Sequence, residues 1–223
     1  MMLRILRFLI RILLNLVARI TIRGREKVPS TGGMILASNH IGILDIVMVY
    51  FAIDRTDLFI PVAEKWGKIG WINWLGKQLN FLFVDRFNPD LKAMRKMIAL
   101  MEDGNCLVIA PEGTRSRTGA LIEGKPGVAY LAARSGFPVF PVAITGTEDK
   151  VILGNLKRLR KSDITLTAGE PFIVPPLPNK DRDTALQKYT DEIMCRMAAL
   201  LPESYRGVYA EHPRLKEILA EEL

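Results

Sequence analysis

Short apolar runs alternate with helical patterns along most of this chain, and that alternation restricts its possible folds more than any other feature. Helical periodicity lies near residues 43–52, 65–78, 89–103, 125–136 and 182–201. Six short runs have the Val, Ile and Leu content of buried strands: 34–37, 58–62, 81–84, 107–110, 139–144 and 164–167. Strands that alternate with helices form a sheet covered on both faces. We therefore predict an α/β fold with a largely parallel central sheet flanked by helices.

The chain has the length of one domain with short appendages. Its 223 residues, of which 49% are hydrophobic, are sufficient to bury a substantial core. Residues 174–183 read VPPLPNKDRD, a composition typical of a surface linker. We predict three parts: an N-terminal amphipathic helix over residues 1–20, an α/β core over 21–173, and a linker with a C-terminal helical tail, packed on the core, over 174–223.

A single polar stripe runs along the otherwise apolar helical pattern of residues 1–20. Its members recur every three or four positions and are Arg4, Arg7, Arg11, Asn15 and Arg19. This pattern predicts a helix that lies in a membrane interface, with its arginines directed at lipid phosphates. Two alternatives stay open. A membrane-spanning helix would carry Arg11 near its middle at a cost of roughly 2.5–3.5 kcal/mol, and a helix packed on the core would turn the stripe to water.

The net charge of +7 comes largely from clustered basic residues. Besides the N-terminal arginines, a second basic run consists of Lys157, Arg158, Arg160 and Lys161. Such patches suit an anionic lipid, an acidic carrier protein or nucleic acid. Aliphatic residues rather than stacking aromatics separate these cations, and the chain carries no nucleic-acid-binding motif. We therefore expect no nucleic-acid partner.

One of the chain's two histidines has a carboxylate close by in sequence. His40 follows the predicted strand 34–37, and Asp45 comes five residues later. On one continuous helix these side chains would point about 140° apart, but if His40 precedes the helix, Asp45 can reach back to its ring. A carboxylate bonded to one ring nitrogen leaves the other nitrogen to act as a base. The alternative is a capping histidine beside an unrelated aspartate.

A polar loop, APEGTRSRTG at residues 110–119, directly follows the predicted strand 107–110. Its backbone N–H groups, hydroxyls and guanidinium groups match the oxygens of a phosphate. Amides near Gly113 are also candidate donors to an oxyanion. The alternative is a solvated polar loop with no ligand.

The remaining candidate chemistry is sparse. Cys106 and Cys195 are far apart and lie in apolar segments, so we predict buried thiols in a reduced compartment. Two scattered cysteines and two scattered histidines predict no metal site. His212 sits in a polar segment, where we predict a solvated side chain. The segment GALIEGKP resembles a P-loop but ends in Pro126, which has no hydroxyl for a magnesium ion.

All three tryptophans lie in one short segment, KWGKIGWINWLGK. They are Trp66, Trp71 and Trp74, and lysines flank them. Indole rings between cations are typical of membrane interfaces. Ordinary core packing and the wall of an acyl channel are the two alternatives.

Four sequence blocks occur in order: His40-x-x-x-x-Asp45, FVDR at 83–86, PEGTRS at 111–116 and VFPVA at 139–143. Together they resemble the glycerolipid acyltransferase family over roughly residues 20–170, and most closely its bacterial 1-acylglycerol-3-phosphate (lysophosphatidic acid) acyltransferases. One block alone would be a weak sign, whereas the ordered set is specific. The second block departs slightly, because Asn80-Phe81-Leu82 stands where a glycine often leads in.

The resemblance implies a role for each matched residue. His40 would deprotonate the acceptor hydroxyl, which attacks the acyl thioester directly, while Asp45 would hold His40. Pro141 belongs to the block associated with the acyl donor. The acceptor phosphate would be bound by Arg86, Glu112, Gly113, Thr114, Arg115, Ser116 and Lys125.

The resemblance further implies a 1-acylglycerol-3-phosphate O-acyltransferase that makes phosphatidic acid in phospholipid biosynthesis. Such an enzyme needs no cofactor beyond its co-substrate, which is acyl-CoA or acyl-acyl-carrier protein. We expect membrane phospholipids and a lysophospholipid acceptor as partners, at the cytoplasmic face of the cell membrane. A sister acyltransferase acting on glycerol 3-phosphate or another lysophospholipid is one alternative. A non-catalytic lipid-binding protein is another, and it would not require the pair formed by His40 and Asp45.

Overall fold

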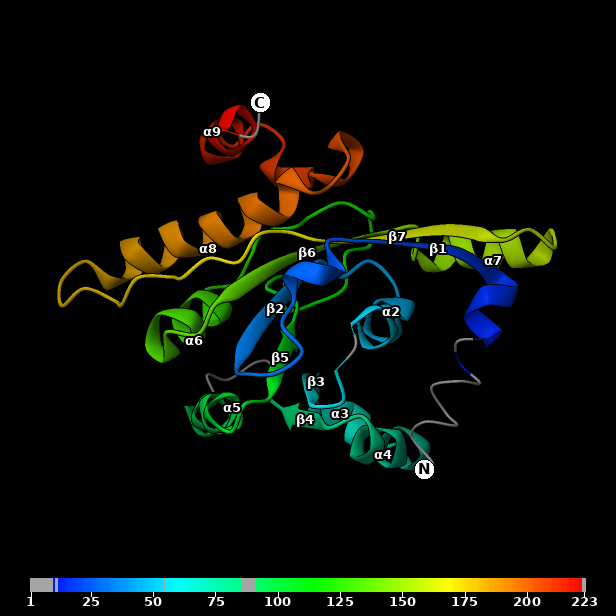
Figure 1. The fold of residues 1–223 in the computed structure, drawn as a ribbon, viewed down its shortest axis with the longest axis horizontal. Coiled ribbons are helices and arrows are strands. Elements are labelled where there is room, and N and C mark those ends of the chain that lie inside the picture. Colours follow the sequence, from blue (N-terminus) through cyan, green and yellow to red (C-terminus); the bar gives the residue numbers. More distant parts are fainter. Residues whose placement is uncertain (1–9, 11, 54, 86–90, 222–223) are drawn as a thin grey trace.

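The computed structural model describes residues 10, 12–53, 55–85 and 91–221, which fold around one twisted sheet (Figure 1). The sheet has seven strands in the order β1-β7-β6-β2-β5-β3-β4. Neighbouring strands are parallel except β6 and β7, which are antiparallel. The predicted α/β fold with a largely parallel sheet is therefore confirmed. The strands are β1 (Ala18–Arg23), β2 (Met34–Ser38), β3 (Leu58–Ala63), β4 (Phe81–Val84), β5 (Cys106–Ile109), β6 (Val139–Thr145) and β7 (Ser162–Ala168).

Helices cover both faces of this sheet. The five predicted helical stretches are present, although the stretch 65–78 is divided into two helices. Of the helices that the structure describes, none combines the length and apolar character that crossing a bilayer requires. The helices are α2 (Leu44–Ala52), α3 (Glu64–Gly67), α4 (Gly70–Gln78), α5 (Leu91–Glu102), α6 (Gly127–Ser135), α7 (Asp149–Lys157), α8 (Arg182–Ala199) and α9 (Pro213–Glu221), with short 3-10 turns at Arg25–Lys27, Glu203–Tyr205 and Gly207–Tyr209.

Strand β2 shows how the two faces of the sheet are buried. Met34 and Leu36 point into a cluster that includes residues of α2, whereas Ile35 and Ala37 point into a second cluster with α5, α6 and α8. All four side chains are at most 2% exposed. A strand buried on both faces needs a continuous apolar run, and each fully buried aliphatic side chain contributes about 1.5–3 kcal/mol. These two clusters hold the end of β2, and with it the start of the candidate site, in a fixed position.

The N-terminal helix ends earlier than predicted. Residues 12–17 are helical, but Ala18 begins strand β1 and pairs with Ser162 of β7. The predicted boundary between the N-terminal helix and the core, at residue 20, therefore falls within a strand. The β-branched residues of this strand favour the extended conformation. Arg19 lies on this strand, 3.6 Å from the carboxylate of Asp163, and not on a helical stripe. The other predicted membrane-binding residues, Arg4, Arg7 and Arg11, lie outside the described residues.

A buried arginine joins loops at the amino-terminal ends of the parallel strands, whereas the candidate site lies at their carboxyl-terminal ends. Arg55 is 2% exposed and donates to both carboxylate oxygens of Asp57, at 2.8 and 2.6 Å. Its guanidinium also donates to the carbonyls of Pro29, Gly32 and Gly104. A buried cation is tolerated only when its donors are paired in this way. Arg55 therefore fixes the loops that lead into β2, β3 and β5.

Candidate active site

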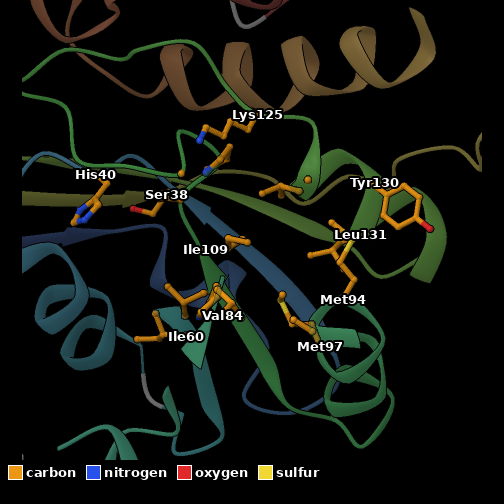
Figure 2. Close-up of a pocket in the computed structure, with 18 of the residues that line it drawn as sticks. Ser38, His40, Ile60, Val84, Met94, Met97, Ile109, Lys125, Tyr130 and Leu131 are labelled. Carbon is orange, nitrogen blue, oxygen red and sulfur yellow. The ribbon is translucent and has the colours of Figure 1, made fainter. Parts of the chain in front are cut away.

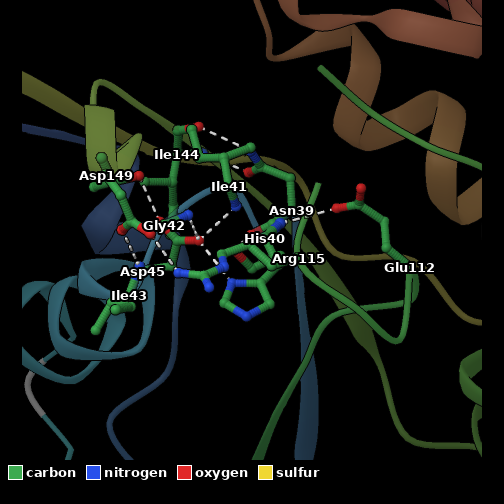
Figure 3. Close-up of polar contacts among 12 residues, drawn as sticks. Asn39, His40, Ile41, Gly42, Ile43, Asp45, Glu112, Arg115, Ile144 and Asp149 are labelled. Atoms are coloured by element: carbon green, nitrogen blue, oxygen red, sulfur yellow. Dashed lines mark hydrogen bonds and ion pairs between the residues drawn. The ribbon is translucent and has the colours of Figure 1, made fainter. Parts of the chain in front are cut away.

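The carboxylate of Asp45 organises a tight turn between β2 and α2 (Figure 3). Its Oδ2 atom accepts hydrogen bonds from the backbone N–H groups of Ile41 and Gly42, at 2.6 and 2.8 Å, and lies 2.8 Å from Nδ1 of His40. Its Oδ1 atom accepts a short hydrogen bond from the hydroxyl of Thr147. Because His40 precedes α2, the predicted contact between the two side chains is present. Asp45 is 4% exposed, so its charge is balanced by these donors rather than by water.

His40 is held from both its side chain and its backbone. Its N–H donates to Oε1 of Glu112 at 2.9 Å, and its carbonyl accepts from the N–H of Ser116 at 2.8 Å. With Nδ1 bonded to Asp45, Nε2 is the ring nitrogen that can act as a base. The imidazole is 21% exposed and lines a cavity, so a substrate can reach it.

Two features of the turn have no counterpart in the predicted site residues. The side-chain amide of Asn39 exchanges two hydrogen bonds with the backbone of Ile144, at 2.7 and 2.8 Å, and so continues the pairing of β2 with β6. A Cβ atom on Gly42 would lie 1.8 Å from the carbonyl oxygen of Thr147. Only glycine therefore lets the segment after β6 approach closely enough for Thr147 to reach Asp45. The asparagine stands next to His40 in the sequence, but nothing in the sequence indicates the contact with Thr147.

Two of the predicted substrate-binding residues are part of the scaffold. Glu112 is 1% exposed, and its two oxygens accept from the N–H groups of His40 and Ile122. Ser116 is 4% exposed, and its hydroxyl donates to the carbonyl of Ala120 at 2.6 Å. Both side chains are already occupied with protein groups. In this structure both side chains therefore position the loop around His40, and their predicted contact with a substrate phosphate stays a prediction.

Other residues of the same loop remain suitable ligands. Gly113 and Lys125 line the cavity, and Thr114 and Arg115 are exposed. The guanidinium of Arg115 lies 2.5 Å from Oδ2 of Asp149, whose Oδ1 accepts from the N–H of Ile43. Asp149 thus holds Arg115 beside the turn that carries His40 (Figure 3). Asp149 is the first residue of α7, a helix that the sequence pattern did not predict, and it was not among the predicted site residues.

The geometry gives two further expectations for this site no support, and a third concerns a residue beyond the described part of the chain. The N–H of Gly113 donates to the carbonyl of Ala110 at 3.0 Å, so this amide is not available to an oxyanion. Pro141 is buried within the sheet opposite Ala37 of β2, and it is not among the described residues that line the cavity. Arg86 lies outside the part of the chain that the structure describes.

The cavity beside His40 has a volume of about 590 Å³, within the range of small-molecule sites. Ser38 and His40 lie on one side of it, and Met94, Met97 and Leu131 lie on the other (Figure 2). Lys125 lies near α8, above the apolar side chains in this view. The lining is mostly aliphatic, with polar groups concentrated where β2 ends. The arrangement suits an alkyl chain whose polar end reaches the imidazole.

The second histidine and the two cysteines are not part of this site. His212 is only 29% exposed, with Nδ1 3.4 Å from Sγ of Cys195, so the predicted solvated position is wrong. His212 directly precedes α9, which packs on α8, and its ring therefore lies beside Cys195 of α8. Cys106 and Cys195 are free and buried, as predicted. Burial raises the pKa of both thiols to about 12, so neither is a ready nucleophile.

Glu112 should give the protein a specific pH dependence of stability. Burial raises the pKa of this carboxyl to about 7 from 4.5, although donors from His40 and Ile122 act in the opposite direction. Between these values the folded chain retains a proton that the unfolded chain has lost. The contribution of Glu112 to the free energy of unfolding therefore falls as the pH rises through this window and levels off above about pH 7.

The variant Glu112→Gln lacks this titration and tests it. The free energy of unfolding, measured by guanidinium denaturation from pH 5 to 8, should fall more steeply with pH in the unmodified protein than in the variant. The difference between the two curves should change by up to about 3 kcal/mol across the window. Parallel curves would show that Glu112 does not titrate there.

Comparisons with known proteins relate this chain to a family. Residues 19–145 match the sequence profile of the acyltransferase family. A 1-acyl-sn-glycerol-3-phosphate acyltransferase of Cocos nucifera is 29% identical over 86% of this chain, and the corresponding protein of Bacillus subtilis is 25% identical over 79%. The matched region spans 61% of the coconut protein, 49% of a Chlamydomonas reinhardtii relative and 87% of the Bacillus protein.

A solved structure supports the same relationship. The 1-acyl-sn-glycerophosphate (LPA) acyltransferase of Thermotoga maritima superimposes with a TM-score of 0.66 and 27% identity. The superposition covers 86% of this chain and 76% of the other. The family match includes β2 and the turn that carries His40 and Asp45, the loop with Arg115, and β6. The chain therefore belongs to the acyltransferase family.

Proposed function

We propose that this protein transfers a fatty acyl group from an acyl thioester to the free sn-2 hydroxyl of 1-acylglycerol 3-phosphate, giving phosphatidic acid. The observation that carries this proposal is the buried Asp45 bonded to His40 in the lining of an apolar cavity. A non-catalytic lipid-binding protein has no need for a carboxylate that orients an imidazole. The names of the relatives support the acceptor, because they are 1-acyl-sn-glycerol-3-phosphate acyltransferases.

The reaction follows from the hydrogen bonds of His40. Nδ1–H of His40 donates a hydrogen bond to the Asp45 carboxylate, so Nε2 takes the proton of the acceptor hydroxyl while the oxygen attacks the thioester carbonyl. The tetrahedral intermediate then collapses, the carbon–sulfur bond breaks, and the proton on Nε2 passes to the leaving thiolate. The products are the new ester and a free thiol, and His40 returns to its starting form. The Asp45 carboxylate stabilises the imidazolium that exists between these two proton transfers.

Cations near the cavity would bind the acceptor phosphate. Lys125 lines the cavity, and Arg115 lies beside the His40 turn with 41% of its side chain exposed. Asp149 neutralises Arg115 in the free protein, so a phosphate would share or displace this carboxylate when it binds. Arg86 would add a third cation, as the family resemblance implies.

The apolar cavity would hold an acyl chain, and the acyl donor would be acyl-CoA or acyl-acyl-carrier protein. Met94, Met97 and Leu131 offer flexible and aliphatic surface to such a chain. Since a lysophospholipid resides in a membrane leaflet, we place the protein at the cytoplasmic face of the cell membrane, as a peripheral protein. The N-terminal arginines would contribute attraction to anionic lipid.

Removal of the base tests the reaction. His40→Ala should lower the rate of phosphatidic acid formation by about 10³-fold, and Asp45→Asn by at least about 100-fold, because both lose the oriented base. The purified protein would be assayed with both donors against 1-acylglycerol 3-phosphate, glycerol 3-phosphate and other lysophospholipids. His212→Ala, the other histidine, is the matched control and should retain activity. Near-normal turnover by His40→Ala would refute the mechanism, and preference for another acceptor would identify a sister enzyme.

Removal of a cation tests the acceptor site. Arg115→Ala should raise the KM for 1-acylglycerol 3-phosphate about tenfold, since one charge-assisted hydrogen bond is worth roughly 1.5–3 kcal/mol. The KM for the acyl donor should change much less. Arg134→Ala, an exposed arginine on α6, serves as the control. A selective defect in the donor KM would instead assign Arg115 to the donor side.

A further inference from the structure

The helices α3 and α4 turn large apolar side chains toward solvent. Trp66, Trp71 and Trp74 are 43%, 68% and 52% exposed, and Ile69 between them is 38% exposed. Trp71 and Trp74 are three residues apart on α4, so they share one face of the helix. A surface helix of a globular domain normally faces its bulky apolar residues inward. These exposures also overturn the alternative of ordinary core packing, and none of the three is among the described residues that line the cavity.

The side of α4 that faces the sheet packs closely on β4, and this packing leaves the tryptophans on the outer side. A Cβ atom on Gly76 would lie 3.1 Å from the rings of Phe81 and Phe83 in β4, which is closer than ordinary contact. The two phenylalanine rings meet edge to face, with centroids 6.5 Å apart. Glycine therefore lets α4 lie directly on these rings, and the bulky residues of the helix remain on its outer side. The exposed tryptophans therefore lie on a helix that is packed firmly against the sheet.

The same segment is positively charged. Lys65, Lys68 and Lys77 are exposed, and Glu64 is the single acidic residue between positions 64 and 80. The ammonium group of Lys65 lies 5.6 Å from the ring of Trp66. Indole rings surrounded by lysines combine apolar area, a polar N–H group and attraction to anions. This combination complements the boundary between anionic headgroups and acyl chains more closely than it complements a purely apolar or a purely charged partner.

The position of the helices relates this face to the candidate active site. Helix α3 begins directly after β3, at the sheet edge where β2 and β5 also end and where His40 lies. Strands β3 and β4, which flank the helices in sequence, supply Ile60 and Val84 to the cavity lining. Figure 1 shows α3 and α4 at the margin of the sheet beside edge strand β4, on the opposite side of the sheet from α8 and α9. A surface that receives α4 would thus lie close to the cavity.

We propose that the tryptophan face of α3 and α4, formed by Trp66, Ile69, Trp71 and Trp74 with Lys65, Lys68 and Lys77, docks on an anionic bilayer. The indole rings enter the interface and the lysines contact lipid phosphates. Docking holds the protein with its cavity near the leaflet from which the lysophospholipid comes. This inference rests on the proposed acyl transfer, and it adds a membrane contact within the catalytic core that is separate from the N-terminal segment.

The chain's own tryptophans report on this contact without any substitution, because it has three tryptophans and all lie on the tryptophan face. The full protein would be mixed with phosphatidylglycerol–phosphatidylcholine vesicles whose acyl chains carry bromine, which quenches nearby indole rings. We expect a blue-shifted emission and strong quenching. Vesicles that pellet the protein while the emission stays unchanged would overturn the proposal, as would failure to bind at all. A shift caused by an acidic acyl-carrier protein without vesicles would assign the face to a protein partner and also overturn it.

A double substitution separates this contact from catalysis. Trp71→Ala with Trp74→Ala should lower the vesicle partition coefficient by at least about tenfold. Ile173→Ala with Val208→Ala removes exposed apolar side chains elsewhere, at 58% and 65% exposure, and should leave partitioning unchanged. Equal partitioning of the two double variants would contradict the proposal.

Activity on a short-chain, water-soluble acceptor distinguishes the two proposals. It should be the same in the unmodified protein and in the tryptophan double variant, because neither tryptophan lines the described part of the cavity. Quenched tryptophans in a protein that transfers no acyl group would refute the proposed function alone. Acyl transfer by a protein with unquenched tryptophans would refute the docking face alone.

Discussion

The carboxylate of Asp45 is the group on which the geometry of the site depends. Four donors meet on its two oxygens: two backbone N–H groups of the turn, the imidazole of His40 and the hydroxyl of Thr147. A carboxylate that is 4% exposed needs these donors to offset its lost hydration. They in turn fix the turn, the ring and the segment after β6 relative to one another. One buried charge therefore sets both the local fold and the orientation of the base.

The parallel sheet brings the remaining parts of the site to the same edge. The ends of β2, β5 and β6 deliver the His40 turn, the loop with Glu112 and Arg115, and the segment with Thr147 and Asp149. Direct contacts join them, since Glu112 accepts from the backbone of His40 and Asp149 accepts from Ile43 while holding Arg115. Residues far apart in sequence thus form one unit. The rigid strands that carry them let short polar loops hold a defined geometry.

The sequence was sufficient to predict the parts of the fold and of the site that depend on local patterns. Apolar runs such as 34–37 identify strands because a parallel sheet buries both faces, and the position of His40 before a helix allowed its contact with Asp45 to be predicted. The strand Ala18–Arg23 was missed because its apolar residues continue the helical pattern before it, and its pairing with β7 settles its conformation. Thr147 and Asp149 could not be found because their contacts with the His40 turn span about a hundred residues. Glu112 and Ser116 lie in the right loop, but only packing shows that their side chains point inward.

The tautomer of His40 tests most directly whether Asp45 orients a base. The chain contains only two histidines, so nitrogen-15 NMR of selectively labelled protein resolves both rings, and His212→Gln assigns them. We predict that neutral His40 carries its proton on Nδ1, bonded to Asp45, and that this preference is lost in Asp45→Asn. A neutral ring protonated on Nε2 would contradict the central claim, because no lone pair would then be available on Nε2 to accept the proton of the acceptor hydroxyl.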